Sequence, residues 1–471
     1  MTFRAKRRPV FVELMVLISL LTFSSFAAAS TGGLSVHLRK DGPTDQIPDS
    51  VRRGIDATIA AYEKAGLALP APKAAGPIYP FFPHAGIQGR DLFLNNFTDL
   101  DPTSGIRDWD CTGQTYDGHR GYDSLIRSFR EQAIGVPIFA VLDGRVVSAH
   151  DGEPDMNTTL NDVPANYVVL DHGGGYYALY WHMKRGSVAV HLNQTVTMGT
   201  QLGLTGSSGY SNWPHLHFES QKDGQWFEPA AGRCRSGASF WKAQPPVPRA
   251  FYIADAYLTR GDVPADSKLT LLLDNVARTS MFVAGFQRVS MRLDYRNLPG
   301  GSTWRLRLIH PNGSTVIDTS GSWGNQVLYR VGWGTFWIED NLTPGIWRMR
   351  VDVNGAKAVD APFTVVTSSA QIVNHRPNSI AARLVPAAPA TGQIMTCQVN
   401  SPLVLRDPDY DIVRYRYEWT VNNKIVRSLT SAALSDVLAK GKVKKGDKVK
   451  CRVTPSDDRV VGASALAEAE P

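Results

Sequence analysis

The stretch WPHLHFE, residues 213–219, holds two histidines two positions apart between apolar and aromatic side chains. This composition predicts a strand over 215–219. Alternate side chains of a strand lie on the same face, so His215 and His217 are expected to point into one cleft while Leu216 points into the core. Two imidazoles on one face indicate either a pair of metal ligands or one ligand beside a general base.

Two other histidines lie in motifs upstream of this strand. GHRGYD, residues 118–123, places His119 four residues before Asp123, and its two glycines argue against a helix. In an extended chain these two side chains also share a face. Imidazole nitrogens and carboxylate oxygens are both good Zn²⁺ ligands. The other histidine, His182, follows the aromatic pair Tyr180-Trp181.

Counting ligands favours a catalytic metal site over a structural one. A catalytic zinc site keeps three protein ligands and one open position, and His119, Asp123 and one histidine of the 215/217 pair make three. The other histidine and His182 are left for general acid–base work, because neutral imidazole titrates near working pH. A bound metal lowers the pKa of its water to about 7. His182 alone would more often be a hydrogen-bonded core residue, but the combined motifs predict a metal centre.

These motifs resemble the lysostaphin-type (LytM-like) zinc metallopeptidases, which cut peptide cross-links or stems of bacterial peptidoglycan. The matching segments are GHRGYD at 118–123, LYWHM at 179–183 and GLTGSSGYSNWPHLHFE at 203–219. The resemblance covers roughly residues 77–230, about a third of the chain. It implies an antiparallel β-sheet groove with few helices.

The same resemblance implies a role for each motif residue. His119, Asp123 and His217 would bind Zn²⁺. His215 would be the general base that activates water, and His182 would stabilise the oxyanion or orient the water. Some members of the family have lost their ligands and act as regulators, whereas this sequence keeps all five positions. The resemblance therefore implies a zinc metalloendopeptidase.

The sequence departs from the family at two places. An Asp-rich loop with a cysteine, Asp99–Asp117, precedes His119. Asn212-Trp213-Pro214 stands where the family usually has a small residue and a proline. Both are expected at the rim of the groove, where they would affect the choice of substrate more than the activity.

Residues 1–29 have the pattern of a secretory signal peptide. A basic start is followed by an apolar run from Leu14 to Phe26 and by Ala27-Ala28-Ala29, which matches a signal cleavage site. The apolar run is shorter than the roughly 20 residues of a membrane span, so an uncleaved anchor is the less favoured alternative. The mature protein is expected in the periplasm, the medium or the cell envelope, with no stable membrane insertion.

The charge balance argues against a nucleic-acid-binding protein, and the cysteine content predicts disulfides. Without residues 1–29 the chain has 46 Lys and Arg against 42 Asp and Glu. This balance argues against a nucleic-acid partner, because phosphate binding needs a concentrated basic face. All four cysteines follow the signal, and an even number in an exported chain predicts disulfides. Pairing inside each proposed domain favours Cys111–Cys234 and Cys397–Cys451 over the other two connectivities.

The sequence predicts a mainly β fold in several parts. They are a helical lead-in and linker at 30–76, a metallopeptidase domain at 77–245, a β-sandwich at 249–367 and an immunoglobulin-like β-sandwich at 372–471. The lead-in has apolar residues at helical spacing, so we expect a helix packed on the next domain. A pro-segment that covers the catalytic cleft is the alternative. The two sandwiches are predicted from alternating apolar residues that end at Asn354-Gly355 and Asn422-Asn423 turns.

The final part resembles the immunoglobulin-like modules of the polycystic-kidney-disease type, which serve as spacers or adhesive units. Asp407, Asp409 and Asp411 form a D-x-D-x-D triplet whose carboxylates could bind Ca²⁺. The glycine and distal glutamate of a helix-loop-helix calcium site are missing, so a plain acidic turn is favoured. Lysines at 442–450 are expected on the solvated face of an edge hairpin, with a wall- or glycan-binding patch as the alternative.

The sequence therefore predicts an exported zinc metalloendopeptidase that hydrolyses peptide bonds of bacterial peptidoglycan by a metal-activated water. Three alternatives stay open. One is an endopeptidase that acts on Gly-rich proteins. Another is a non-hydrolytic module that recruits a cell-wall hydrolase, and the third is an adhesin whose C-terminal modules carry the main role.

Overall fold

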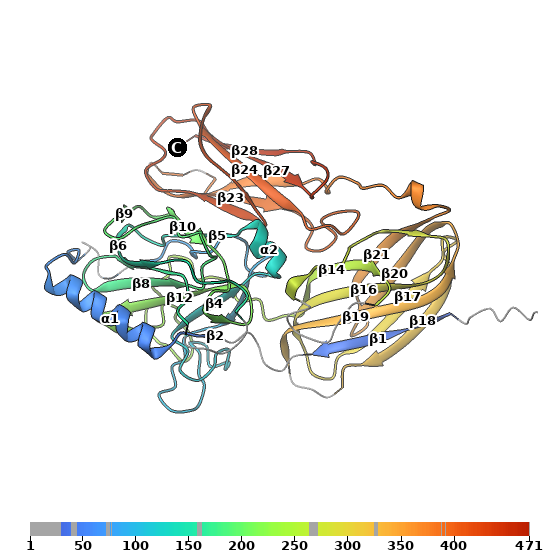
Figure 1. The fold of residues 1–471 in the computed structure, drawn as a ribbon, viewed down its shortest axis with the longest axis horizontal. Helices are drawn as coiled ribbons and strands as arrows, with labels where there is room; N and C mark the ends of the chain where they lie inside the picture. The colour runs from blue at the N-terminus through green and yellow to red at the C-terminus, as the bar shows by residue number, and fades with distance from the viewer. Residues whose placement is uncertain are drawn as a thin grey trace, which may run out of the picture.

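Strands dominate the computed structural model (Figure 1). The residues that it describes are 30–38, 45–71, 76, 78–157, 163–262, 272–324, 328–387, 389–390 and 392–470. The fold class predicted from the sequence, mainly β with an antiparallel catalytic sheet and further β domains, is confirmed. These residues contain the helices α1 (Asp49–Lys64), α2 (Phe129–Ile134) and a 3₁₀ turn at Ser369–Gln371. None of these helices is long and apolar enough to cross a membrane. The predicted signal, 1–29, lies outside the described residues.

The strand with the paired histidines, β12 (His215–Lys222), lies inside an eight-stranded antiparallel sheet. The sheet order is β3 (Phe93–Asn96), β4 (Gly121–Leu125), β12, β8 (Tyr176–Trp181), β7 (Tyr167–Asp171), β6 (Gly144–His150) and β9 (Thr195–Val196), with β13 (Gln225–Trp226) paired to the end of β12. Two short ladders join β5 (Pro137–Phe139) to β10 (Gln201–Leu204), and β2 (Asp45–Gln46) to β11 (Tyr210–Ser211). In the register of the sheet, His217 lies between Asp123 on β4 and Trp181 on β8, so these three residues share a face.

The two faces of this sheet have different roles. Leu216 is fully buried in the apolar core below the sheet, as predicted, together with Phe218 on the same strand and Tyr180 on β8. The opposite face carries His215 and His217. Successive side chains of β12 therefore point alternately into the core and toward the candidate site.

Helix α1 packs on the face that carries His217. Its buried side chains Ile55, Ile59 and Tyr62 contact Val169 of β7 and Leu179 of β8. Apolar residues three and four positions apart lie on one side of a helix, which is why the sequence predicts both the helix and its packing. The lead-in is thus part of the structure around the candidate site.

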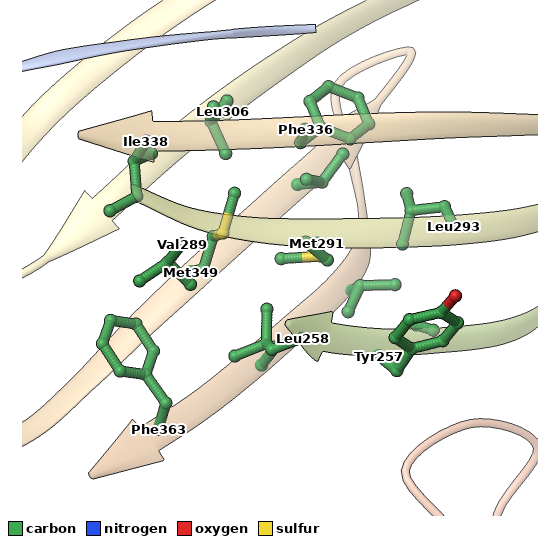
Figure 2. Close-up of a cluster of buried hydrophobic side chains, with 14 of the residues drawn as sticks. Tyr257, Leu258, Val289, Met291, Leu293, Leu306, Phe336, Ile338, Met349 and Phe363 are labelled. Carbon is green, nitrogen blue, oxygen red and sulfur yellow. The ribbon is translucent and has the colours of Figure 1, made fainter. Parts of the chain in front are cut away.

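A β-sandwich follows the sheet in the chain. Its first sheet has the order β1 (Thr31–Leu38), β19 (Tyr329–Leu342), β16 (Gly285–Leu298) and β14 (Tyr252–Arg260). Its second has the order β15 (Met281–Val283), β21 (Ala356–Val366), β20 (Gly345–Val353), β17 (Thr303–Ile309) and β18 (Thr315–Ser322). Figure 2 shows the core between them, with Met291 and Phe336 from one sheet and Met349 and Phe363 from the other.

The last part of the chain forms another pair of sheets. One has the order β22 (Ala381–Val385), β23 (Met395–Asn400) and β26 (Ser435–Leu438). The other has the order β25 (Lys424–Ser431), β24 (Arg414–Val421), β27 (Val449–Ser456) and β28 (Ala465–Ala469). Cys397 and Cys451 form a disulfide that joins the two sheets, as predicted. The predicted turns are also present, because Asn354, Gly355, Asn422 and Asn423 all have the positive φ that two-residue hairpins need.

Two elements were not predicted from the sequence. Strand β1 comes from the lead-in but pairs with β19 of the first sandwich (Figure 1). Helix α2 lies in the domain for which few helices were expected and no particular one was predicted; the Ser128 side chain accepts a hydrogen bond from the Glu131 N–H at its start. That Ser-x-x-Glu spacing is a helix-start signal, but six residues are too few for a clear apolar period. The domain boundaries stay predictions.

Apolar contacts join the catalytic sheet to both sandwiches. Trp213 and Phe93 pack with Val331 and Trp333 of the first sandwich. Leu92 and other residues near β5 pack with three side chains of the C-terminal pair of sheets, which are Ala432, Ala433 and Val437. The three β regions therefore share buried contacts around the catalytic sheet.

We expect the stability of the protein to depend on the protonation of Glu228, which lies after β13. Glu228 is buried and accepts hydrogen bonds from the Tyr122 hydroxyl and the Ala230 N–H. Burial raises the pKa of this carboxyl from 4.5 to about 8. Because the folded state favours the protonated acid, stability should fall as the pH rises from about 4.5 to about 8, by a few kcal/mol. Glu228→Gln, which cannot ionise, should remove this part of the loss.

Thermal unfolding midpoints between pH 5 and pH 8 measure this effect. The midpoint of the Glu228→Gln protein should fall less steeply with pH than that of the unchanged protein. Glu470→Gln, at a largely exposed position, serves as the control and should follow the unchanged protein. Parallel curves for Glu228→Gln and the unchanged protein would show that Glu228 does not titrate in this range.

Candidate metal centre

Three side chains from two neighbouring strands bring one atom each to a common point. Nε2 of His119 lies 3.0 Å from Oδ1 of Asp123 and 3.1 Å from Nδ1 of His217, and the last two atoms are 3.0 Å apart. Asp123 and His217 are direct cross-strand partners on β4 and β12, and His119 lies two residues before β4. These three residues form a buried group with the geometry of a metal site.

Neighbouring groups fix how two of these side chains point. Nδ1 of His119 lies 2.7 Å from the Phe97 carbonyl oxygen, which can only accept, so Nδ1 carries the proton and Nε2 has a lone pair. The other oxygen of Asp123, Oδ2, accepts a hydrogen bond of 2.7 Å from Nδ2 of Asn96 on β3. Asn96 and Phe97 therefore hold the donor atoms of His119 and Asp123 toward each other.

The donor set fits a zinc ion. Zinc in a tetrahedral site lies about 2.0–2.2 Å from nitrogen and oxygen ligands, which places the ligand atoms roughly 3.3 Å apart. The observed separations of 3.0–3.1 Å are close to this value. Without a cation, a lone pair and a carboxylate oxygen would face each other across this distance and repel. Two nitrogens and one oxygen leave a fourth position for water or substrate.

His215 and His182 lie beside the three donor atoms. Nε2 of His215 is 3.6 Å from Oδ1 of Asp123, and the rings of His215 and His182 are 4.6 Å apart. Their Nδ1 atoms lie 2.8 Å and 2.7 Å from the carbonyl oxygens of Trp213 and Ser208. Both rings therefore carry the Nδ1 proton when neutral and have an Nε2 that can take up a proton. His182 has a φ of 59°, a conformation uncommon for a residue with a side chain and often found at functional sites.

A buried ion pair lies behind His217. Oε2 of Glu219 is 3.6 Å from Nε2 of His217 and accepts a hydrogen bond of 2.7 Å from Nη1 of Arg52 on α1. Burial alone would raise the pKa of the Glu219 carboxyl, but Arg52 and His217 outweigh burial and keep the pKa well below its usual range. The carboxylate favours a proton on Nε2 of His217, which leaves the lone pair on Nδ1 for a metal.

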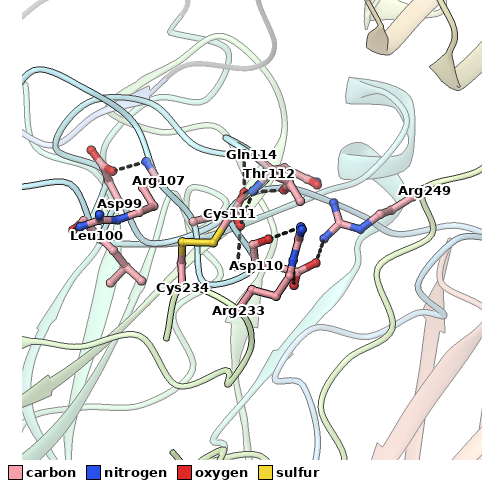
Figure 3. Close-up of a disulfide and its surroundings, with 11 residues drawn as sticks. Asp99, Leu100, Arg107, Asp110, Cys111, Thr112, Gln114, Arg233, Cys234 and Arg249 are labelled. Carbon is pink, nitrogen blue, oxygen red and sulfur yellow. Dashed lines mark hydrogen bonds and ion pairs between the residues drawn. A yellow bond between two sulfur atoms is a disulfide. The ribbon is translucent and has the colours of Figure 1, made fainter. Parts of the chain in front are cut away.

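The Asp-rich loop 99–117 supports a ligand instead of lying at the rim. The N–H of Asp99 donates to the His119 carbonyl, and the Asp99 carboxylate accepts from the N–H groups of Arg107 and Gly118. Cys111 forms the predicted disulfide with Cys234 (Figure 3). The start of the loop is thus bonded to the ligand segment, and the expected effect of the loop on substrate choice stays a prediction.

Further along the loop, Asp108 holds the turn that carries Cys111. Its carboxylate accepts hydrogen bonds from the N–H groups of Asp110, Thr112 and Gln114. Burial alone would raise the pKa of Asp108, but these hydrogen bonds outweigh it, so the pKa lies below its usual value. Asp110 in turn pairs with Arg233 and Arg249, as Figure 3 shows. The disulfide is thus set in a dense polar network.

Trp213 also differs from its expected place at the rim. It is buried and stacks on Trp333 of the first sandwich, with ring centroids 4.9 Å apart and planes 15° apart. Its Nε1 donates to the Ile126 carbonyl next to β4. The bulky residue thus attaches a sandwich to the start of β12, a reason that the local sequence could not show.

The side chains of the candidate site are buried. All five predicted site side chains are at most 2% exposed. Strand β2 of the lead-in pairs with β11, whose Ser211 Oγ lies 3.2 Å from Nδ1 of His215. The lead-in therefore borders the candidate centre.

The structure brings together every predicted site residue, and it adds others that the sequence analysis missed. Asn96, Glu219 and Arg52 contact the ligands or each other. Glu219 could have been noticed, because it lies two residues after His217 and therefore on the same face of β12. Asn96 and Arg52 are far from their partners in the chain, and no local signal marks them.

Comparison with known proteins agrees with this geometry. The model of "Peptidase family M23" matches residues 119–229. The peptidoglycan DD-endopeptidase ShyA of Vibrio cholerae is 34% identical over 86 residues, which are 18% of this chain and 17% of that protein. The glycyl-glycine endopeptidase ALE-1 of Staphylococcus capitis is 31% identical over 86 residues, 18% of this chain and 21% of that protein. The chain thus spans about a fifth of the length of the curated relatives it matches.

Among solved structures, the catalytic domain of lysostaphin from Staphylococcus simulans is 21% identical, with a TM-score of 0.20, over 30% of this chain and 89% of that chain. The sequence match is confined to the part of the chain that carries His119, Asp123 and His217. M23 peptidases are metallopeptidases. Residues 119–229 of this protein are therefore similar to the peptidase M23 family.

Proposed function

We propose that this protein is an exported zinc metalloendopeptidase that hydrolyses peptide bonds in bacterial peptidoglycan. The convergence of His119, Asp123 and His217 within 3.1 Å carries the proposal. It is supported by the zinc dependence of the M23 family and by relatives named as peptidoglycan endopeptidases. The predicted signal at 1–29 and two disulfides support export, because disulfides persist in oxidising compartments.

His119 through Nε2, His217 through Nδ1 and Asp123 through Oδ1 would hold the zinc ion. When bound, zinc acts as a Lewis acid and lowers the pKa of a water to about 7. Asn96 and the Phe97 carbonyl orient two of the ligands, and Glu219 orients the third. The ligand atoms are therefore arranged before a metal arrives, which reduces the reorganisation that binding requires.

His215 and His182 would carry the proton transfers. Each has its Nδ1 proton bonded to a backbone carbonyl, so Nε2 of the neutral ring can accept a proton and return it to the leaving amine. His215 lies closer to the ligand atoms, with Nε2 at 3.6 Å from Asp123, and is the proposed general base. His182, held beside it by a strained backbone, would orient the water or stabilise the oxyanion.

The first test is hydrolysis of purified peptidoglycan sacculi by the mature protein. Release of muropeptides should depend on zinc and stop with a chelator, and fragment masses will identify the bond. His217→Ala and Asp123→Ala should lower bound zinc and reduce release by at least about a hundredfold. His215→Ala should keep zinc but lose about 10²–10⁴-fold in rate.

His191→Ala serves as a control, because this exposed histidine lies outside the cluster. Full activity of the Asp123→Ala or His217→Ala protein would refute the site assignment. A zinc-loaded protein that releases nothing would indicate a different substrate or a shielded precursor, since the site side chains are buried. A protein with neither zinc nor activity would indicate a non-hydrolytic module that recruits another hydrolase.

The substrate alternative is a Gly-rich protein, and it has one specific support. The relative ALE-1 is named a glycyl-glycine endopeptidase. Sacculi with direct cross-links, sacculi with pentaglycine bridges and a soluble Gly-rich protein should be compared at equal enzyme concentration. We expect release from sacculi to exceed cleavage of the soluble protein.

The last two domains are proposed as spacers or adhesive modules. Binding of the zinc-loaded, inactive His215→Ala protein to the same sacculi tests this role.

The Arg52–Glu219 pair should control zinc affinity. Glu219→Gln removes the charge that favours a proton on Nε2 of His217, so zinc should bind about 10–100-fold more weakly in competition with a chromophoric chelator. Arg52→Met leaves Glu219 buried without its guanidinium, which should destabilise the fold by about 3–5 kcal/mol. Combining the two changes should restore much of the stability but not the zinc affinity.

Arg53→Met is the matched control for this experiment, because Arg53 is the exposed neighbour of Arg52 on α1. Its zinc affinity and unfolding midpoint should equal those of the unchanged protein. Unaltered zinc affinity in the Glu219→Gln protein would mean that the carboxylate does not orient the ligand.

A further inference from the structure

A second group of acidic side chains lies in the C-terminal part, far from the candidate zinc centre in the sequence. One carboxylate oxygen each of Asp407, Asp411 and Asp457 lies within 4.8 Å of the others. Asp407 and Asp457 are 1% and 5% exposed, and Asp411 is half-buried. The D-x-D-x-D motif contains two of these residues, whereas Asp457 comes from the loop after β27.

Nearby cations act on the acidic cluster only from beyond ion-pair distance. Among the described residues, no Lys, Arg or His forms an ion pair with any of the three carboxylates; their neighbours Asp409 and Asp458 pair with His375 and Arg414 instead. Arg459 lies close enough to favour the charged form of Asp411, yet burial still raises the pKa of that residue.

An unsatisfied oxygen within the cluster indicates a missing ligand. Oδ1 of Asp407 accepts the Asp409 N–H at 2.7 Å, but its Oδ2 is buried and has no hydrogen-bond partner among the described residues. A buried carboxylate oxygen without a donor is unfavourable by a few kcal/mol, unless a cation takes the place of the donor.

Hydrogen bonds hold the loops around the cluster. Asp457 accepts the N–H groups of Arg459 and Val460 and a side-chain hydrogen bond from Asn374. Asp409 does not belong to the cluster, because its carboxylate accepts hydrogen bonds from Ser280 and His375. Three oxygen ligands with no nitrogen or sulfur donor suit a hard cation.

We infer that Asp407, Asp411 and Asp457 bind a Ca²⁺ ion. Calcium accepts irregular sets of carboxylate oxygens and waters, and the half-buried Asp411 leaves a side open for water. Mg²⁺ demands near-octahedral geometry, and zinc prefers nitrogen and sulfur. The ion lies where the last two β regions meet, since Ser280 contacts Asp409 and the Tyr410 hydroxyl donates to the Pro362 carbonyl. Its role is to fix these regions against each other.

Calcium titration of the full mature chain tests this site independently of catalysis. The protein is stripped of metal, reloaded with zinc and titrated with CaCl₂ by calorimetry. One ion should bind with a dissociation constant on the order of 0.1–1 mM, and saturating calcium should raise the unfolding midpoint by a few degrees. Failure of the peptidase assay does not affect this result, because the zinc centre uses other residues.

Asp407→Asn removes the charge and keeps the Oδ1 acceptor for the Asp409 N–H. This variant should show no calcium heat, and its unfolding midpoint without calcium should equal or exceed that of the unchanged protein, because repulsion is relieved. Asp457→Asn should also lose calcium binding. Asp458→Asn, the half-exposed neighbour that pairs with Arg414, should bind calcium normally.

Three results would overturn the assignment. They are no calcium response in the unchanged protein, a normal response in the Asp407→Asn protein, and an equal response to Mg²⁺.

Discussion

One atom each of His119, Asp123 and His217 lies within 3.1 Å of the others in a buried place, and this arrangement is unfavourable unless a proton or a metal ion joins them. A fold that keeps such a cluster must hold each side chain from outside. The Phe97 carbonyl holds His119, Asn96 holds Asp123, and Glu219 lies behind His217. The candidate metal centre therefore depends on strands β3, β4 and β12 together and not on the histidine motif alone.

Strand β12 connects this centre with the rest of the molecule. Just before it, Trp213 stacks on the first sandwich. Within it, Leu216 and Phe218 fill the core below the sheet, and Glu219 receives a guanidinium from α1. A strand fixed at its start, centre and far side has little freedom to shift, which gives the catalytic groups the rigidity that a preorganised site needs. The accessory parts contribute to that rigidity through buried contacts.

Whether the sequence predicts a contact depends on how far apart the two residues lie in the chain. The H-x-H pair and the buried Leu216 follow from strand alternation, and α1 follows from helical spacing, because both patterns are local. The hairpin turns at 354–355 and 422–423 have local signals as well. The pairing of β1 with β19 and the stacking of Trp213 on Trp333 join residues more than a hundred positions apart. No local pattern encodes such partners, so Trp213 was expected at the rim although it is buried against the first sandwich.

The Arg52–Glu219 contact bears on the role of the lead-in. A removable pro-segment that included α1 would take away the guanidinium that pairs with Glu219 and expose the apolar side of Leu179 and its neighbours. The carboxylate would then face His217 without a counter-charge, which disfavours the charged form that orients the ligand. Release of segments that precede α1 has no such consequence. The charge balance of this site therefore favours α1 as a permanent part of the mature protein, whatever happens to the strands before it.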